Sequence, residues 1–363
     1  MSSGARRPFE LRDDLAKLPP YRAPQDDAPI RLNTNESPYP PPDKVMAEVA
    51  EGVRRLPLNR YPDRDAQGLR RALSERNEWP ADGVWAANGS NEIIQTLMLA
   101  FGGAGRRALL FEPTYAMHSH IALVTGTGVV RRQIDEPWIL DPTAVAAAVS
   151  ESEPALTFVC SPNNPTGNAQ PVEAVEAALS AGSGLVVVDE AYGEFGGVSA
   201  LGLAGKHDRV VVVRSFSKSW RLAGVRLGYL LAHPWLVEAI QVARLPYHLS
   251  ATTQLIGETV LRHAQAALAA VTEIVMERER LAKELARVPG IEVFPSDANF
   301  LLLRTPVEAT PLWRRLAAAG VLVRDFSGVP GLERCLRVTV GTADQNATFV
   351  ETLRSVLNAG EEA

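Results

Sequence analysis

A lysine surrounded by hydroxyl groups and glycines is the sequence feature best suited to covalent chemistry. The stretch RSFSKSWRLAGVRLG, residues 214–228, places Lys218 directly after an apolar run. An amine at the end of a buried strand is partly desolvated, which lowers its pKa and lets it form an imine with an aldehyde. Ser215, Ser217 and Arg226 add two hydroxyl donors and a guanidinium, which suit a phosphate dianion. A lone lysine is usually a solvated surface charge. The prediction that Lys218 is a nucleophile beside a phosphate site therefore depends on these neighbouring residues.

An acidic residue is expected at the same edge of the structure. Asp189 directly follows the apolar run 185–188, and Tyr192 comes three residues later. A buried carboxylate needs a cationic partner, and the protonated ring nitrogen of pyridoxal 5'-phosphate is one; holding that proton makes the ring an electron sink. Tyr192 is a candidate donor to the phenolic oxygen of the same ring. The competing interpretation of Asp189 is a helix N-cap.

Three further motifs contain candidate cofactor ligands. In SPNNPTG, residues 161–167, two prolines and a glycine predict a rigid turn that presents the side-chain amide of Asn164. In NGSNE a strand passes into an apolar helix, so the backbone N–H groups of Ser90 and Asn91 are placed to bind phosphate at a helix N-terminus. Tyr115 is a candidate for stacking on a cofactor ring, although an aromatic loop residue more often packs in the core.

The elements that position these residues follow an α/β pattern. Short, almost continuously apolar runs alternate with helix-like stretches, and such runs predict a mostly parallel sheet buried on both faces. Ligands bind beyond the carboxyl ends of such strands, so we expect the polar motifs to meet at one site. The predicted strands are Val84 to Ala87, Ala108 to Phe111, Leu156 to Cys160, Leu185 to Val188 and Val210 to Val213.

The remainder of the chain predicts an arm and a second domain. Prolines between about residues 19 and 42 favour an extended arm over a helix. A helical region from about Ala251 to Ala286 leads into a smaller α+β domain. The expected boundaries are 1–42 for the N-terminal arm, 43–248 for the large cofactor-binding domain and 249–363 for the small domain, packed with the arm. In the small domain we expect a helix around Leu312 to Ala319 and strands at Ile291 to Phe294, Asn299 to Arg304, Val321 to Arg324 and Leu336 to Val340.

The composition argues against several classes of protein. The 363 residues carry a net charge of -5, which offers no basic surface for nucleic acid or anionic lipid. The two cysteines form neither a disulfide framework nor a metal site, and the sequence contains no apolar stretch typical of export or membrane insertion. We therefore expect a cytoplasmic protein that uses no metal and holds any phosphate locally.

These motifs, in this order, resemble the fold-type I pyridoxal-phosphate enzymes, and within the class II aminotransferases the histidinol-phosphate aminotransferase family. SPNNPTG, DEAY and SFSK with the later arginine are typical of the superfamily; LNTNE, RYPD, PYHLS, VLVRD and LRVTVGT are typical of the narrower family. The resemblance covers nearly the whole chain. It implies an aspartate-aminotransferase-like fold with a mostly parallel seven-stranded sheet and a small α+β domain.

The resemblance also implies roles around pyridoxal 5'-phosphate. Lys218 would bond covalently to the cofactor and move a proton, Asp189 would pair with its ring nitrogen, and Asn164 and Tyr192 would bond its ring oxygen. Its phosphate would be bound by Ser90, Asn91, Ser215, Ser217, Arg226 and, from the neighbouring subunit of a homodimer, Tyr61.

The implied substrates are histidinol phosphate and 2-oxoglutarate, converted to imidazole-acetol phosphate and glutamate in histidine biosynthesis. Arg337 would clamp a substrate carboxylate, which lysine cannot do bidentately. Arg324 and Tyr21 would meet the substrate's distal phosphate, and Asn35, in LNTNE, is a further candidate for substrate binding.

Departures from the family pattern leave alternatives open. NESP replaces the usual NENP, and Arg221 beside Trp220 replaces a small residue, which bears on the substrate accepted. An aromatic amino-acid aminotransferase is the main alternative, although Arg324 would then have no anion to bind. A decarboxylase acting on a phosphorylated amino acid uses the same fold. A transcription regulator would need a DNA-binding module, and about 30 residues before LNTNE are too few for one.

Overall fold

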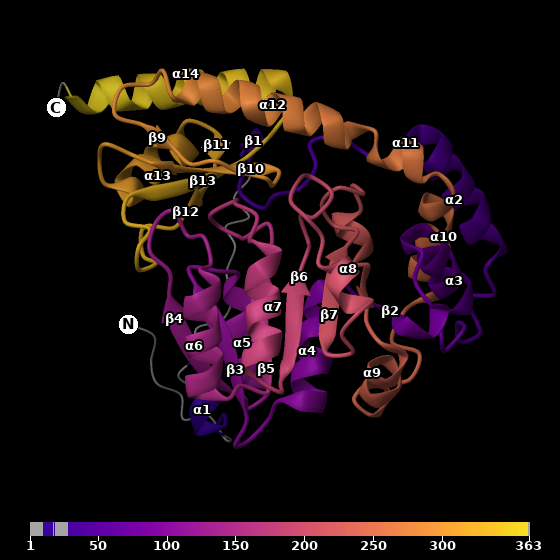
Figure 1. Cartoon of the computed structure of the whole chain (residues 1–363). Helices are drawn as coiled ribbons and strands as arrows, with labels where there is room; N and C mark the ends of the chain where they lie inside the picture. The colour runs from indigo at the N-terminus through magenta and orange to yellow at the C-terminus, as the bar shows by residue number, and fades with distance from the viewer. Residues whose placement is uncertain (1–9, 17, 19–27, 362–363) are drawn as a thin grey trace.

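A seven-stranded sheet forms the centre of the larger part of the molecule (Figure 1). The computed structural model describes residues 10–16, 18 and 28–361. Neighbouring strands follow the order β2-β8-β7-β6-β5-β3-β4, and every pair is parallel except those that include β8. The predicted mostly parallel sheet is confirmed, with these bounds: β2 Val84–Ala87, β3 Arg107–Glu112, β4 Gly128–Gln133, β5 Leu156–Cys160, β6 Leu185–Asp189, β7 Val210–Ser215 and β8 Gly228–Leu231.

The strands are almost continuously apolar because both faces of the sheet are covered. In β6 and β7, Val186 and Val210 face one core while Val187 and Val211 face the other, as the two-residue period of a strand requires. The first core also contains residues of α6 (Pro142–Ser152) and α7 (Val172–Ala181), and the second contains residues of α4 (Ser90–Phe101) and α5 (Ala116–Val124).

The smaller part is built on two short sheets beneath two long helices. The sheet β12-β13-β10-β9 is antiparallel, and β1 of the arm pairs with β11 in parallel. Helices α12 and α14 contact each other and lie across these sheets (Figure 1). The bounds are β1 Ile30–Arg31, β9 Glu292–Val293, β10 Phe300–Arg304, β11 Val321–Leu322, β12 Arg324–Asp325, β13 Cys335–Thr339, α12 Ala270–Leu285, α13 Ala309–Ala318 and α14 Ala343–Glu361.

The predicted helical region 251–286 is divided into α10, α11 and α12. Ser250 caps α10 by accepting a hydrogen bond from the backbone N of Thr253 (3.0 Å). Helix α10 packs on α2 and α3 at the far end of the large sheet (Figure 1). The remaining elements are α1 Asp13–Ala16, α2 Asp43–Arg55, α3 Gln67–Asn77, α8 Leu201–Ala204, α9 Pro234–Ala239, α10 Ala251–Arg262, α11 Ala264–Leu268 and the 3-10 turns Ala81–Gly83, Ala223–Val225 and Ile240–Val242.

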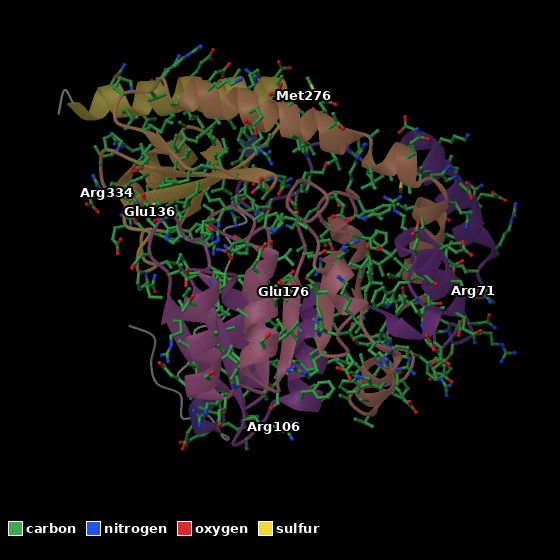
Figure 2. The ribbon with its side chains drawn as sticks, viewed as in Figure 1. Arg71, Arg106, Glu136, Glu176, Met276 and Arg334 are labelled. Atoms are coloured by element: carbon green, nitrogen blue, oxygen red, sulfur yellow. The ribbon has the colours of Figure 1, made fainter. Side chains whose placement is uncertain are left out.

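The two parts are joined by polar contacts at the carboxyl ends of the large-sheet strands. Glu136, after β4, forms an ion pair with Arg304 at the end of β10 (2.5 Å), at the edge where the two parts meet (Figure 2). Gln133 donates to the backbone oxygen of Pro330 (3.2 Å). Within the described residues, no helix is both long and apolar enough to cross a membrane.

Candidate active site

A cavity of about 340 Å³ opens between the carboxyl ends of the large-sheet strands, residues 33–36 and the smaller part of the molecule. Its volume is within the range of small-molecule sites. The structure therefore brings together residues from motifs distributed over 300 positions of the sequence. The predicted site residues that line the cavity are Asn35, Ser90, Asn91, Tyr115, Asn164, Asp189, Tyr192, Ser215, Ser217, Lys218, Arg226, Arg324 and Arg337.

Lys218 lies three residues after β7 with its amine directed into the cavity. Its Nζ donates to the backbone oxygen of Thr34 in the arm (2.8 Å) and lies 5.8 Å from the centre of the Tyr192 ring. Burial, together with the positive charges of Arg337 and Arg226, lowers the pKa of Lys218 to about 7. A substantial fraction of this amine is therefore neutral and nucleophilic near neutral pH.

Asp189 ends β6 and is held by partners on both carboxylate oxygens. Oδ2 lies 3.0 Å from Nε2 of the fully buried His118, and Oδ1 accepts from the backbone N of Ala191 (3.1 Å). Only 2% of Asp189 is exposed. These bonds give the carboxylate a fixed orientation toward the cavity, where it suits a cationic ring nitrogen.

The cradle for an anion combines a helix N-terminus with hydroxyl groups and a guanidinium. Helix α4 begins at Ser90, Ser215 Oγ accepts from the backbone N of Ser217 (3.1 Å), and Arg226 Nη1 lies 3.4 Å from Ser217 Oγ. Gly89 has a φ of +82°, and a Cβ there would approach Arg226 Nη2 to 2.9 Å. The lack of a side chain thus lets the guanidinium lie against the start of the helix. This donor set fits a phosphate dianion.

The arm and the small domain supply the opposite side of the cavity. Arg337 Nη1 donates to Asn164 Oδ1 (2.5 Å), and its Nη2 donates to the backbone oxygen of Asn33 (2.7 Å). Arg324 on β12 is paired in register with Arg337 on β13, so two guanidinium groups reach one cavity. Asn35, predicted to bind substrate, lines the cavity and donates through Nδ2 to Tyr192 Oη (2.9 Å).

Two predicted residues lie elsewhere. Tyr61 is 79% exposed, stacks on Tyr247 with ring centres 4.4 Å apart and does not line the cavity of its own subunit. Tyr21 is outside the described residues. Arg221, considered for an effect on substrate choice, donates to the backbone oxygen of Pro40 (3.1 Å) and does not line the cavity.

Sequence reasoning missed His118, although its position contained a usable signal. His118 lies three residues after Tyr115 in the first turn of α5, so both side chains are on one helix face, and the two rings meet edge to face at 5.3 Å. Thr34, Glu36, Thr114, Cys160 and Phe326 also line the cavity without having been singled out.

The site combines a partly neutral lysine, a buried carboxylate and an anion cradle, which together fit pyridoxal 5'-phosphate. A lysine can bond to its aldehyde, Asp189 can pair with its ring nitrogen, and the cradle matches its phosphate. The fit rests on donors and acceptors present in the cavity.

Comparisons with known proteins agree with this site. Residues 27–353 match the family described as aminotransferase class I and II. A histidinol-phosphate aminotransferase of Frankia casuarinae is 47% identical over 96% of this chain and 90% of its own length. A histidinol-phosphate aminotransferase of Thermobifida fusca is 47% identical over 94% of each chain.

Solved structures show the same fold. Histidinol-phosphate aminotransferase from Sinorhizobium meliloti, in complex with pyridoxal-5'-phosphate, superposes with a TM-score of 0.88 at 22% identity, covering 99% of both chains. An aspartate aminotransferase variant of Thermus thermophilus superposes with a TM-score of 0.79 at 20% identity, over 96% of this chain and 99% of that one. The fold is therefore the aspartate-aminotransferase-like fold type I. With the family match over residues 27–353 and relatives at 47% identity, the chain belongs to the aminotransferase class I and II family.

Proposed function

We propose that this protein is a pyridoxal-phosphate-dependent histidinol-phosphate aminotransferase of histidine biosynthesis. It would convert histidinol phosphate and 2-oxoglutarate to imidazole-acetol phosphate and glutamate. The observation that carries the proposal is the cavity in which Lys218, with a pKa of about 7, lies among two arginines and an anion cradle. The names of the 47% identical relatives support the same reaction.

Pyridoxal 5'-phosphate, when bound, supplies an aldehyde for the substrate amine and a ring that withdraws electrons from the substrate Cα. Asp189 would pair with the ring nitrogen, held in place by His118. Tyr192 and Asn164 would bond the ring oxygen, and Tyr115 would stack on the ring. The residues that would bind the phosphate are Ser90, Asn91, Ser215, Ser217 and Arg226.

Lys218 would move the proton of the reaction. Its Nζ would accept the proton from the substrate Cα and would donate a proton again later in the same half-reaction. A base is most effective when its pKa is close to the working pH, and the burial that lowers the pKa of Lys218 to about 7 meets this condition. Thr34 would hold the amine through its backbone oxygen, which accepts from Nζ at 2.8 Å.

Arg324 and Arg337 would recognise the anionic groups of the substrates. The two residues are paired in register on neighbouring strands, and both line the cavity. Arginine binds carboxylate and phosphate bidentately, so the pair suits a substrate with a phosphate as well as one with a carboxylate. Tyr21 would join Arg324 at the substrate phosphate.

The protein would work as a cytoplasmic homodimer that completes its sites across the interface. Tyr61 stacks on Tyr247, and apolar residues close in sequence to one or other of these tyrosines are exposed in the single subunit: Leu58 (69%), Val242 (88%) and Leu245 (73%). Burial of this surface against a second copy would bring Tyr61 to the partner's phosphate cradle. Both cysteines are free thiols, which agrees with a reducing compartment. The arm 1–42 and the domains 43–248 and 249–363 remain our proposed division of the chain.

The test is a coupled assay of the purified protein with pyridoxal phosphate. Histidinol phosphate and phenylalanine are compared as amino donors to 2-oxoglutarate, beside Lys218→Ala and a control, Lys206→Ala, at an exposed position of the same domain. We expect a large preference for histidinol phosphate that Lys218→Ala abolishes and Lys206→Ala retains.

Other outcomes would redirect the proposal. A preference for phenylalanine would place the protein among the aromatic aminotransferases, with the role of Lys218 unchanged. Carbon dioxide released from a phosphorylated amino acid, without transamination, would indicate a decarboxylase.

A further inference from the structure

Tyr192 faces the cavity with a hydroxyl group that already accepts a hydrogen bond. The side chain is 5% exposed, and its ring packs edge to face on Phe300 with centres 5.2 Å apart. Its oxygen accepts from Asn35 Nδ2 at 2.9 Å. Asn35 is itself only 1% exposed, so this bond is protected from water.

The orientation of the Asn35 amide is set by Thr339, on β13 of the small domain. The backbone N of Asn35 donates to Thr339 Oγ1 (2.9 Å), and Thr339 Oγ1 donates its own hydrogen to Asn35 Oδ1 (3.1 Å). Asn35 adopts a left-handed φ of +55°, which asparagine tolerates better than most residues. Asn299 fixes the same residue from the other side by donating to its backbone oxygen (3.1 Å).

The donors and acceptors in the hydrogen bonds among Thr339, Asn35 and Tyr192 can be assigned in only one way that satisfies the buried Thr339 hydroxyl. The hydroxyl of Thr339 is buried and needs an acceptor for its hydrogen, which Asn35 Oδ1 provides. With Oδ1 used in this way, the NH2 group of Asn35 must face Tyr192. Tyr192 therefore receives a hydrogen from Asn35 and keeps its own O–H hydrogen for an acceptor in the cavity. Burial raises the pKa of Tyr192 to about 12, so this hydrogen is present throughout the neutral range.

We propose that Thr339 and Asn35 are positioning residues that fix Tyr192 as a hydrogen-bond donor toward the ring oxygen of the cofactor. This inference rests on the proposed function and assigns to Asn35 a role distinct from direct substrate binding. We call Thr339, Asn35 and Tyr192 the relay. Its hydrogen bonds connect β13 through Asn35 to Tyr192 in the lining of the cavity.

A spectroscopic readout follows from the chemistry of the ring oxygen. A hydrogen bond donated to an anionic oxygen favours the anion, so its loss raises the pKa of the bound cofactor chromophore. A hydrogen bond of ordinary strength corresponds to an upward shift of roughly one pH unit. The charged and titratable groups around Tyr192, namely Arg337, Lys218, Asp189 and Cys160, are the same in every variant at Thr339.

The experiment titrates the absorbance of bound pyridoxal phosphate against pH in the holoenzyme. Thr339→Val removes the hydroxyl at nearly constant volume, whereas Thr339→Ser keeps it. Thr305→Val is the matched control, because Thr305 is also buried in the small domain and donates to the backbone oxygen of Val307 (2.7 Å). Tyr192→Phe and the double variant with Thr339→Val complete a thermodynamic cycle. Thermal unfolding followed by circular dichroism shows which variants are folded.

We expect Thr339→Val to raise the chromophore pKa, with Thr339→Ser and Thr305→Val close to the parent protein. In the Tyr192→Phe background, Thr339→Val should have no further effect, because the donor that it orients is gone. The proposal would be overturned if Thr339→Val left the chromophore pKa unchanged. It would also be overturned if Thr339→Val shifted this pKa equally with Tyr192 and with Phe at position 192. Failure of the proposed function has a different signature: the parent protein would bind no cofactor, or would bind it and transaminate neither histidinol phosphate nor phenylalanine.

Discussion

The cavity has two walls that differ in how their residues are brought together. The sheet wall consists of Asn164, Asp189, Ser215, Ser217 and Lys218, each of which ends or follows a strand of one sheet. The arm wall consists of Asn33, Asn35, Arg324 and Arg337. The bonds of this wall, including that from Asn35 to Thr339 behind it, join residues 304 positions apart. The pairing of the neighbouring strands β5, β6 and β7 brings the first wall together, whereas the second depends on contacts between residues about 300 positions apart.

The largest effect should come from the sheet wall, at Asp189. Asp189→Asn keeps the shape of the side chain but removes the charge that would pair with the ring nitrogen. Loss of one member of a buried ion pair costs about 3–5 kcal/mol, so we expect kcat to fall roughly 10²–10⁴-fold. Steady-state kinetics would measure this, with the exposed Asp208→Asn as control. A variant within a few-fold of the parent would contradict the assigned role.

Arg337→Lys should break the contact between the two walls. Lysine cannot bond Asn164 Oδ1 and the backbone oxygen of Asn33 at the same time, nor bind a carboxylate bidentately. Loss of charge-assisted hydrogen bonds worth about 1.5–3 kcal/mol predicts a fall in kcat/KM of roughly 10- to 100-fold.

The control for that change is Arg334→Lys, at an exposed position of the small domain (Figure 2). If the two lysine variants have the same kcat/KM, the arm wall does not use Arg337 to bind substrate.

Substitution of His118 tests whether Asp189, in the sheet wall, needs its hydrogen bond to His118 in order to function. His118→Phe would leave Asp189 Oδ2 without its 3.0 Å partner, and a buried acceptor without a donor costs about 1–3 kcal/mol. We expect cofactor affinity and kcat to fall roughly tenfold, with partial recovery in His118→Gln, whose amide can donate. Equal affinities for pyridoxal phosphate in the parent and His118→Phe, measured by fluorescence titration, would show that Asp189 is held without His118.

The smallest expected effect is on the pH dependence of cofactor capture by Lys218 in the sheet wall, which the charge of Arg337 in the arm wall influences. Because the pKa of Lys218 is lowered to about 7, its amine is charged below this pH and neutral above it. Capture of added pyridoxal phosphate by the cofactor-free protein should therefore accelerate as the pH rises through about 7, and then level off.

Arg337→Met removes a positive charge that lowers the pKa of Lys218, so the same curve should move to higher pH. Stopped-flow absorbance would follow the capture. A curve unmoved by Arg337→Met would mean that the charge of Arg337 does not contribute to the lowered pKa of Lys218.

The sequence by itself determined the large sheet and most of its catalytic edge. Continuous apolar runs can be satisfied only by strands covered on both faces, and parallel strands end at a common edge. For that reason the strands β2, β3, β5, β6 and β7 were predicted to within two residues, and their polar motifs do meet at one cavity. The resemblance to a known family supplied the reaction, which hydrophobic periodicity cannot specify.

Only the tertiary structure decided which distant residues meet. His118 contacts Asp189 because α5 contributes to the same core as residues of β5 and β6, and the His118 ring centre lies 4.9 Å from that of Phe158 on β5. The spacing of His118 from Tyr115 could mark it as a candidate but does not encode this contact. The direction of the hydrogen bonds through Thr339, Asn35 and Tyr192 likewise depends on pairing between the arm and β13. Local sequence sets the period and ends of an element, whereas contacts between elements 300 residues apart depend on how whole surfaces pack.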